Sequence, residues 1–236
     1  MNSQSFLASG GEQNHRNKFV ASNTVNVQEH EANCSDESAF GDSDLRSCAL
    51  KSAQQGDYTE AIALLSQLIG RHPQNAVDYN NRGLIYFQSG DTQKAFVDYN
   101  RALQLNPNLA SAYNNRANYY AANGELAEAI ADYDRALDLN PGYVRAWINR
   151  GITLRDLGQY EEAIDNLEVA LLFGQLEGHI LAERGRTYYL WGDWNCAIAD
   201  YRRALSKLPP QAIKRDEPGW RLRLQVENWL NDLLFP

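Results

Sequence analysis

The chain has 236 residues and a formal net charge of −8 at pH 7. This acidic balance argues against non-specific binding to nucleic acid, because such binding needs clustered lysines and arginines to displace the counterions of the phosphates. No apolar run approaches the roughly 20 residues of a membrane-spanning helix. The N-terminus also lacks the apolar stretch of about 7–15 residues that a signal peptide requires. We therefore expect a cytoplasmic protein that binds no nucleic acid and is not an integral membrane protein.

The three cysteines, Cys34, Cys48 and Cys196, are odd in number and lie far apart. This spacing predicts neither a disulfide framework nor a metal-binding cluster, and it favours a reducing compartment.

Residues 1–41 are rich in Ser, Asn, Gln and Glu and contain only isolated apolar residues. Such a segment buries too little apolar surface to offset the entropy of ordering it, so we expect a disordered N-terminal tail. A solubilising leader is the simplest interpretation. A short binding or phosphorylation motif among its serines is the alternative.

From residue 42 onward the chain repeats itself with a fixed period. The stretch from Ala76 to Leu109 contains two amphipathic helical patterns, separated by Gly90-Asp91 and closed by Asn106-Pro107. The same pattern returns at Tyr113, at Trp147 and at Leu181. A fixed period of this length is typical of stacked-repeat proteins. It divides the chain into five units, 42–75, 76–109, 110–143, 144–177 and 178–211.

Each unit carries small residues where two helices would approach closely and large residues that would fill the volume between them. A glycine at 90, 124, 158 and 192 predicts a left-handed end to each first helix. The small positions are Gly83, Ala117, Gly151 and Gly185 in the first helices and Ala95, Ala129, Ala163 and Ala197 in the second.

These residues resemble the tetratricopeptide repeat (TPR) family, whose pattern is a small residue, a tyrosine, an alanine, an aromatic, an alanine and a proline at fixed offsets. The resemblance covers about residues 42–211. It implies an all-α fold, a right-handed α-solenoid of five helix-turn-helix units. The fourth unit departs from the pattern, with Leu154, Leu167 and Gln175 for the tyrosine, the aromatic and the proline. We therefore expect the turn after Leu172 to be looser or differently angled.

The segment 212–236 follows Pro209-Pro210 and carries one apolar stripe of helical spacing. The resemblance implies a C-terminal capping helix that covers the open face of the last unit. A helix for dimerisation or docking is the alternative. The stripe consists of Leu222, Val226, Trp229, Leu230, Leu233 and Leu234.

The seventh residue of four units is an arginine, and an aspartate follows it sixteen residues later in three of them. We predict arginine–aspartate pairs between packed helices, with a structural role. The arginines are Arg82, Arg116, Arg150 and Arg184, and the aspartates are Asp98, Asp132 and Asp200.

No motif in the sequence indicates catalysis. The four histidines stand apart from other metal-ligand residues, and there is no phosphate-binding glycine loop, nucleophile elbow or HExxH. We expect a non-enzyme with no catalytic residues, no cofactor and no metal.

In the resembling family the first helix of each unit lines a concave groove, which implies a peptide-binding set here. At its centre, Asn81, Asn115 and Asn149 recur at the sixth position of three units. In related arrays such a ladder hydrogen-bonds a peptide backbone, and an amide offers both donors and an acceptor. The alternative is that asparagine is only the commonest residue of this repeat. The full set is Asn80, Asn81, Leu84, Phe87, Asn114, Asn115, Asn118, Arg145, Ile148, Asn149, Ile152, Arg155, Arg186 and Tyr189.

Arg145, Arg155 and Arg186 of this set form a local cationic cluster on an acidic protein. The cluster favours a ligand segment that carries carboxylates and apolar anchors. Alternatively, Asp156 and Glu183 neutralise these arginines internally.

We expect a monomer or weak homodimer that acts as an adaptor or assembly factor and binds an extended protein segment in the groove. The alternative is a regulatory subunit that docks through its convex face or its C-terminal helix. The C-terminal tails of chaperones do not fit, because His179 and Glu183 stand where that mode needs cations. The repeat style resembles small soluble TPR proteins of photosynthetic bacteria, a fold-level analogy.

Overall fold

The computed structural model describes residues 41–209 and 218–235, and the statements on structure below refer to these residues. The predictions for the N-terminal tail before Gly41 and for the link at 210–217 lie outside the described residues.

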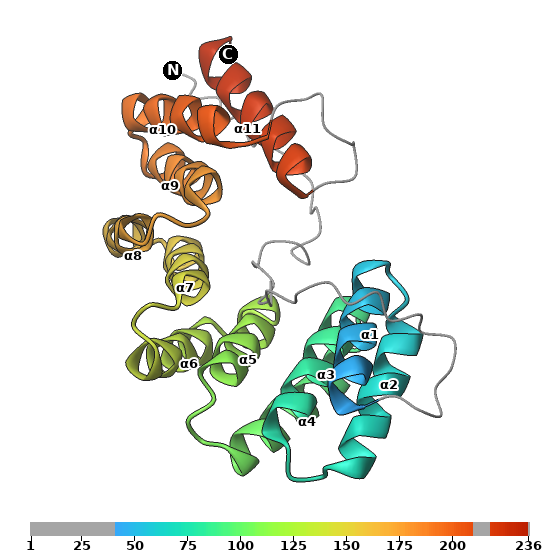
Figure 1. Cartoon of the computed structure of the whole chain (residues 1–236). Helices are drawn as coiled ribbons and strands as arrows, with labels where there is room; N and C mark the ends of the chain where they lie inside the picture. Colours follow the sequence, from blue (N-terminus) through green and yellow to red (C-terminus); the bar gives the residue numbers. More distant parts are fainter. Residues whose placement is uncertain (1–40, 210–217, 236) are drawn as a thin grey trace, which may run out of the picture.

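The described chain consists of consecutive helices joined by short turns (Figure 1). Five helix pairs are followed by a single helix. They are α1 (Asp42–Gln54) and α2 (Tyr58–Arg71), α3 (Ala76–Ser89) and α4 (Thr92–Leu105), α5 (Ala110–Ala122) and α6 (Leu126–Leu139), α7 (Val144–Asp156) and α8 (Tyr160–Leu172), α9 (Glu177–Trp191) and α10 (Trp194–Lys207), and α11 (Pro218–Leu234).

The pairs stack into a curved array in chain order (Figure 1). From α3 to α10, the first helix of each pair lies toward the concave side and the second lies outside. Along that side α3 contacts α5, α5 contacts α7, and α7 contacts α9. The predicted all-α right-handed solenoid is therefore confirmed.

Small and large residues meet between the two helices of a unit as the pattern predicts. Tyr99, Tyr133 and Tyr201 are fully buried. A Cβ atom added at Gly83 would lie 2.8 Å from the Tyr99 ring, and one added at Gly185 would lie 2.7 Å from the Tyr201 ring. The absence of a side chain at these two glycines thus lets the tyrosine of the second helix sit against the first.

The turns inside the units share one backbone feature. The glycine that ends each first helix has a left-handed backbone, as at Gly90 with a φ of 92° and Gly192 with a φ of 93°. The α8–α9 turn differs from the other turns, because Leu176 has a left-handed backbone with a φ of 54°. The prediction that this turn departs from its equivalents is confirmed.

Helix α11 covers the last pair. Its Val226 is fully buried, and its Trp229 ring lies 5.7 Å from the Tyr201 ring, centroid to centroid. Leu222, Leu230 and Leu233 pack into the same cluster with residues of α9 and α10. Five of the six stripe residues thus shield the last unit, so the predicted capping helix is confirmed; the sixth, Leu234, is exposed.

The predicted arginine–aspartate pairs form inside three units, each with two parallel bonds. In Arg116, Nε donates to Oδ2 of Asp132 at 2.7 Å, and Nη2 donates to Oδ1 at 2.8 Å. Arg82 bonds Asp98 in the same way at 2.7 and 2.8 Å. Arg184 bonds Asp200 at 2.6 and 2.9 Å. These hydrogen bonds raise the pKa of all three arginines, against the opposing effect of burial.

The same arginines also bond to the second helix of the preceding unit, which the sequence pattern did not reveal. Nη1 of Arg116 donates to Oδ1 of Asn100 in α4 at 2.7 Å. Its guanidinium carbon also lies 5.6 Å from the Tyr113 ring centre and 5.9 Å from that of Tyr120. One side chain thus connects α5 to both α6 and α4. We call this arrangement the arginine bridge; Arg82 and Arg184 repeat it with Ser66 and Glu168.

In the fourth unit the arginine bridge is rearranged. Asn166 occupies the aspartate position and accepts from Nη1 of Arg150 at 2.9 Å. The carboxylate comes instead from the preceding unit, where Asp134 accepts from Nε at 2.7 Å. Because the side chain of Asp134 is 51% exposed, this pair is more solvated than the others.

Two further sequence expectations concern the cysteines and membrane insertion. Cys48 in α1 is buried and disulfide-bonded, so the prediction that the cysteine spacing gives no disulfide is wrong for Cys48. Cys196 in α10 is a free thiol. No helix within the described ranges is long and apolar enough to span a membrane.

The arginine bridge predicts a large effect of Arg116→Ala on stability. The change leaves the buried Asp132 carboxylate without its guanidinium, and we expect the free energy of unfolding to fall by about 3 kcal/mol. The matched control is Arg150→Ala, whose carboxylate partner is solvated, so the loss is about 1 kcal/mol. Urea denaturation followed by circular dichroism measures both. Equal losses in the two variants would contradict the structural role of the bidentate pair.

Candidate functional site

The structure divides the predicted groove residues into a buried group and a partly exposed group. The partly exposed side chains are Asn81, Phe87, Arg145, Arg186 and Tyr189. The buried ones are Asn80, Leu84, Asn114, Asn115, Asn118, Ile148, Asn149, Ile152 and Arg155.

The buried asparagines bond to one another across three first helices. Nδ2 of Asn115 in α5 donates to Oδ1 of Asn80 in α3 at 3.0 Å. Nδ2 of Asn149 in α7 donates to Oδ1 of Asn118 at 3.0 Å and to Oδ1 of Asn114 at 3.4 Å, both in α5. Bonds from Asn80 to Asn81 and from Asn114 to Asn115 complete the series, which we call the amide chain.

The amide chain ends in the interior of the third unit, where the hydroxyl of Tyr133 donates to Oδ1 of Asn118 at 2.6 Å. Each buried amide therefore uses hydrogen-bonding capacity within the protein, and buried polar groups are generally paired in this way. In this conformation the amide chain ties neighbouring units together. Recognition of a peptide backbone by these asparagines remains a prediction.

The apolar members of the set also have internal partners. Ile148 and Ile152 are fully buried and pack with Val144, Leu167 and Ile180. These residues come from α7, α8 and α9, so the cluster fills the junction between the fourth and fifth units. In this conformation the two isoleucines are not accessible to a ligand.

Arg155 is neutralised internally, as one of the two sequence interpretations holds. Its Nη1 lies 2.6 Å from Oε2 of Glu183, and its Nε lies 3.5 Å from Oδ1 of Asp156. Burial lowers the pKa of Arg155, but the two carboxylates outweigh burial and the net shift is upward. The guanidinium therefore joins α7 to α9 as a buried ion pair.

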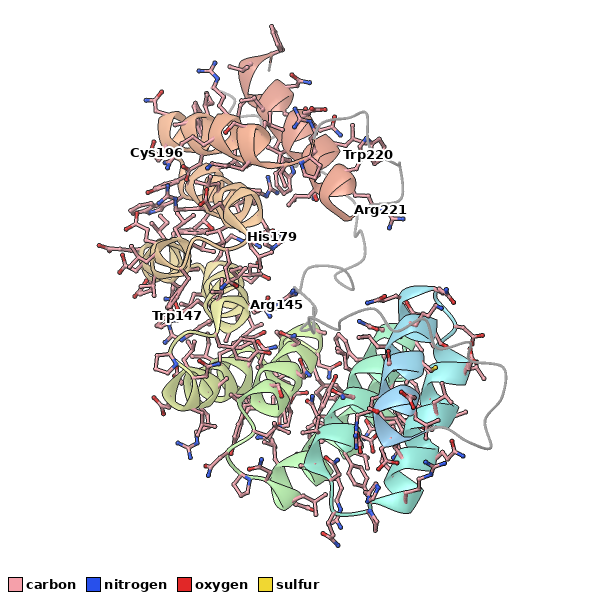
Figure 2. All side chains as sticks on the ribbon, viewed as in Figure 1. Arg145, Trp147, His179, Cys196, Trp220 and Arg221 are labelled. Atoms are coloured by element: carbon pink, nitrogen blue, oxygen red, sulfur yellow. The ribbon has the colours of Figure 1, made fainter. Side chains whose placement is uncertain are left out.

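Arg145 and His179 lie on the open side of the array, one on α7 and one on α9 (Figure 2). Both are half-buried. Burial lowers the pKa of Arg145, which means that its surroundings disfavour the cation. Burial also lowers the pKa of His179, and the nearby Arg145 and Arg155 lower it further while Glu183 opposes them.

Arg186 lies about two turns beyond His179 along α9, beside aromatic rings. Its guanidinium carbon is 5.0 Å from the Tyr189 ring centre and 5.2 Å from that of Trp229 in α11. Asp232 joins these three residues around a small cavity of about 20 Å³. Figure 2 shows that Trp220 and Arg221, at the start of α11, also lie toward the open side.

A second exposed feature, missed in the sequence, is the turn between α9 and α10. Trp191 is 50% exposed and Trp194 is 63% exposed. With Gly192, Asp193 and Asn195 they line an open hollow of about 490 Å³. The sequence does contain a sign of this feature. At the position of Trp191 the second and third units have polar residues, Ser89 and Asn123, so a tryptophan there departs from the repeat.

The amide chain predicts that Asn149→Ala is destabilising. The change removes the donor to two buried oxygen atoms, and an unsatisfied buried group costs about 1–3 kcal/mol. The control is Asn81→Ala, at the half-buried end of the chain, for which we expect less than about 1 kcal/mol. Chemical denaturation of the two variants measures the difference. If Asn149→Ala were as stable as the wild type, the amide chain would not hold the units together.

The lowered pKa of His179 predicts a pH-dependent stability. The ordinary value is 6.5, so as the pH falls below it the unfolded chain takes up a proton before the folded chain does. The free energy of unfolding therefore falls with pH in this window, and His179→Gln removes this contribution. Urea denaturation at pH 7.5 and pH 5.5 should show a smaller loss for the variant. An identical loss would mean that burial of His179 is not coupled to folding.

Repeat-family profiles match several stretches of the array. Those described as tetratricopeptide repeat match residues 49–75 and 108–173, and one described as TPR repeat matches residues 83–124. No curated protein sequence matches the chain.

Several solved structures share the fold. A thermophilic TPR protein of Thermus thermophilus, TTC0263, superposes with a TM-score of 0.67 at 19% identity, over 83% of this chain and 100% of that one. PilW, a widely conserved type IV pilus biogenesis factor, gives a TM-score of 0.66 at 22% identity, over 81% and 92%. MamA gives 0.58 at 23% identity, over 67% and 93%. The repeat pattern, the stacked helix pairs and the matching profiles agree: the chain belongs to the tetratricopeptide repeat family.

Proposed function

We propose that this protein is a non-catalytic interaction scaffold, an adaptor or assembly factor. It binds an extended, acidic segment of a partner protein along the C-terminal half of its concave face. The observation that supports this proposal is that Arg145, Trp220 and Arg221 lie toward the open side of the array (Figure 2), while Arg186 of α9 stacks on Tyr189 and on Trp229 of α11.

The N-terminal half of the same face supports binding less well. There the amides of α3 and α5 bond to each other, so a ligand would have to compete with internal hydrogen bonds. In the C-terminal half the guanidinium of Arg186 stacks on two rings and keeps part of its surface exposed. Arginine and aromatic side chains are enriched among the residues that contribute most to binding.

The charge of the partner segment follows from the site and not from the whole protein. With a net charge of −8, long-range attraction does not draw an acidic segment to this molecule. Selection would have to come from charge-assisted hydrogen bonds formed at contact, which carry geometric specificity. Among the structural neighbours, PilW is a pilus biogenesis factor, and an assembly role for this chain is an analogy with it.

A second candidate is docking on an enzyme or transcription factor outside the concave face, as a regulatory subunit. The exposed pair Trp191 and Trp194 at the α9–α10 turn favours it, because two large apolar side chains at one turn are typical of an interaction surface. Leu224 and Phe235 of the C-terminal segment are also exposed.

A capture experiment with matched charge reversals distinguishes the two candidates. The full chain and three variants are used as bait in extract from the source organism, and melting curves confirm that each variant is folded. Arg186→Glu should reduce recovery of the specific partner at least tenfold, because it opposes the acidic segment. Arg202→Glu, the same charge change at an exposed position of α10, should leave recovery unchanged.

Retention of the partner by folded Arg186→Glu would contradict concave binding. Loss of the partner only with Trp194→Ala would instead support the regulatory docking surface at the α9–α10 turn.

A further inference from the structure

The turn between α9 and α10 exposes two tryptophans around one hollow. Trp191 ends α9 and is 50% exposed, and Trp194 begins α10 and is 63% exposed. The hollow of about 490 Å³ is lined by these two residues with Gly192, Asp193 and Asn195. Single exposed apolar side chains are common on protein surfaces, but two large rings around one hollow are typical of a binding surface.

Local hydrogen bonds hold this turn in one shape. The backbone nitrogen of Gly192 donates to the oxygen of Tyr189 at 3.2 Å. The backbone nitrogen of Asp193 donates to the oxygen of Tyr188 at 2.9 Å. Oδ1 of Asp193 accepts from the backbone nitrogen of Cys196 at 3.0 Å and thereby caps α10. The tryptophans thus extend from an ordered backbone, and a ligand would not have to order the turn before it binds.

Asp193 adds a negative charge to the hollow. Its hydrogen bond to the Cys196 thiol is the main cause of the raised pKa of that thiol. Together with the cap, Cys196 uses two of the roughly four acceptor sites of the carboxylate and leaves the others. The stretch 191–196 contains no lysine, arginine or histidine. The faces of aromatic rings attract cations, so two indoles beside a carboxylate fit a cationic group.

The turn between α7 and α8 extends this chemistry to the neighbouring unit. It holds the same place in the fourth unit that the α9–α10 turn holds in the fifth, and α9 contacts both α7 and α8. Leu157 in this turn is 46% exposed, and Glu161 and Glu162 after it are exposed. The stretch 157–162 again contains no lysine, arginine or histidine. The two turns therefore form an edge of the array that is both apolar and acidic.

The position and the charge of this edge favour a basic partner. Cys196, the third residue of α10, lies away from the open side of the array (Figure 2). A partner at this edge therefore need not enter the concave face. The net charge of −8 attracts a basic segment at long range, whereas it opposes an acidic one.

We propose that Trp191, Asp193 and Trp194 bind an arginine side chain in a basic segment of a partner protein. This inference rests on the second candidate function, docking at the α9–α10 turn, and specifies its partner; it does not depend on concave binding. The guanidinium stacks on an indole face and donates to the remaining acceptor sites of Asp193. Further cations of the segment lie against Glu161 and Glu162.

An arginine fits this hollow better than a lysine or an apolar anchor. A guanidinium is planar, so it stacks on a ring and still donates hydrogen bonds in its own plane. An ammonium is compact and strongly hydrated, and it makes no such stack. An apolar anchor would take water from the Asp193 carboxylate without giving it a partner, which costs free energy.

The test follows the indole N–H signals of the full chain by NMR. The chain has five tryptophans, and Trp191→Phe and Trp194→Phe assign the two signals of the turn. The probe is a short capped peptide of alternating glycine and arginine, and the same peptide with citrulline in place of arginine is the neutral control. The arginine peptide should shift the signals of Trp191 and Trp194 and leave that of Trp147 in place. The citrulline peptide should shift none of them, and a lysine peptide should bind about threefold more weakly.

Two charge variants separate this site from general attraction to an acidic protein. Asp193→Asn removes the charge but keeps an oxygen that caps α10, and it should weaken the arginine peptide about fivefold. Asp138→Asn removes the same charge from a side chain that is 72% exposed on α6, and it should change the affinity less than about twofold. Equal weakening by the two variants would show general attraction only and would overturn the site.

Other occupants of the edge give different results. If the signals of Trp191 and Trp194 move with protein concentration when no peptide is present, the occupant is a second copy of this chain. If phosphatidylcholine vesicles shift these signals and the arginine peptide does not, the occupant is a membrane surface. Either result would overturn the basic segment.

The proposal and the function on which it rests can fail separately. A captured partner that is lost with Trp194→Ala, but is displaced by neither the arginine nor the citrulline peptide, would keep docking at the turn and overturn arginine recognition. A partner that Trp194→Ala retains would overturn both. Loss of a partner with Arg186→Glu bears only on concave binding.

Discussion

The arginine bridge is the interaction on which the stacking of this array depends. A guanidinium is planar, so two parallel bonds to one carboxylate fix its orientation as well as its position. Arg116 uses the third nitrogen for Asn100, and one side chain thereby sets α5 relative to α6 and α4 at once. Arg82 and Arg184 repeat this contact in the second and fifth units, which gives these units a similar orientation relative to their neighbours.

The orientation set by the arginine bridge determines what the concave face can offer. Where α3, α5 and α7 meet, the first helices lie close enough for asparagines of adjacent units to bond each other. From α7 onward the composition of this interface changes. Fully buried Ile148 and Ile152 and the Arg155–Glu183 pair replace the amides. The rearranged bond of Arg150 and the left-handed Leu176 lie in the same region. The contacts between successive units therefore differ between the third and fifth units from those between the earlier ones.

Much of this fold follows from the sequence because it depends on helical periodicity. The alternation of small residues with tyrosines predicts which helix faces pack, and the sixteen-residue interval predicts the partners of Arg82, Arg116 and Arg184 correctly. Glycine at 90 and 192 predicts the left-handed helix ends for the same local reason. The bonds from the arginines back to the preceding unit were missed, because they depend on how units are rotated against each other.

The candidate site was predicted less well, for a physical reason that the asparagines illustrate. Periodicity assigns Asn115 and Asn149 to the face that points along the concave side, but it does not tell how closely adjacent first helices approach. In the structure the approach buries them. His179 holds the same position in its unit as Arg145, so the repeat register already assigns both to the concave side. The burial of its Nε2 atom depends on tertiary packing and was not predicted.

In the proposed function, the partner segment binds to the C-terminal half of the concave face, while the side chains of the N-terminal half hold neighbouring units together. Amide hydrogen exchange of the free protein and of its complex with the captured partner tests this most directly, because it reports protection segment by segment. The account predicts added protection in α7, in α9 and at the start of α11, with α3 and α4 unchanged. Protection confined to α3 and α5, or to the outer helices α4, α6 and α8, would contradict it.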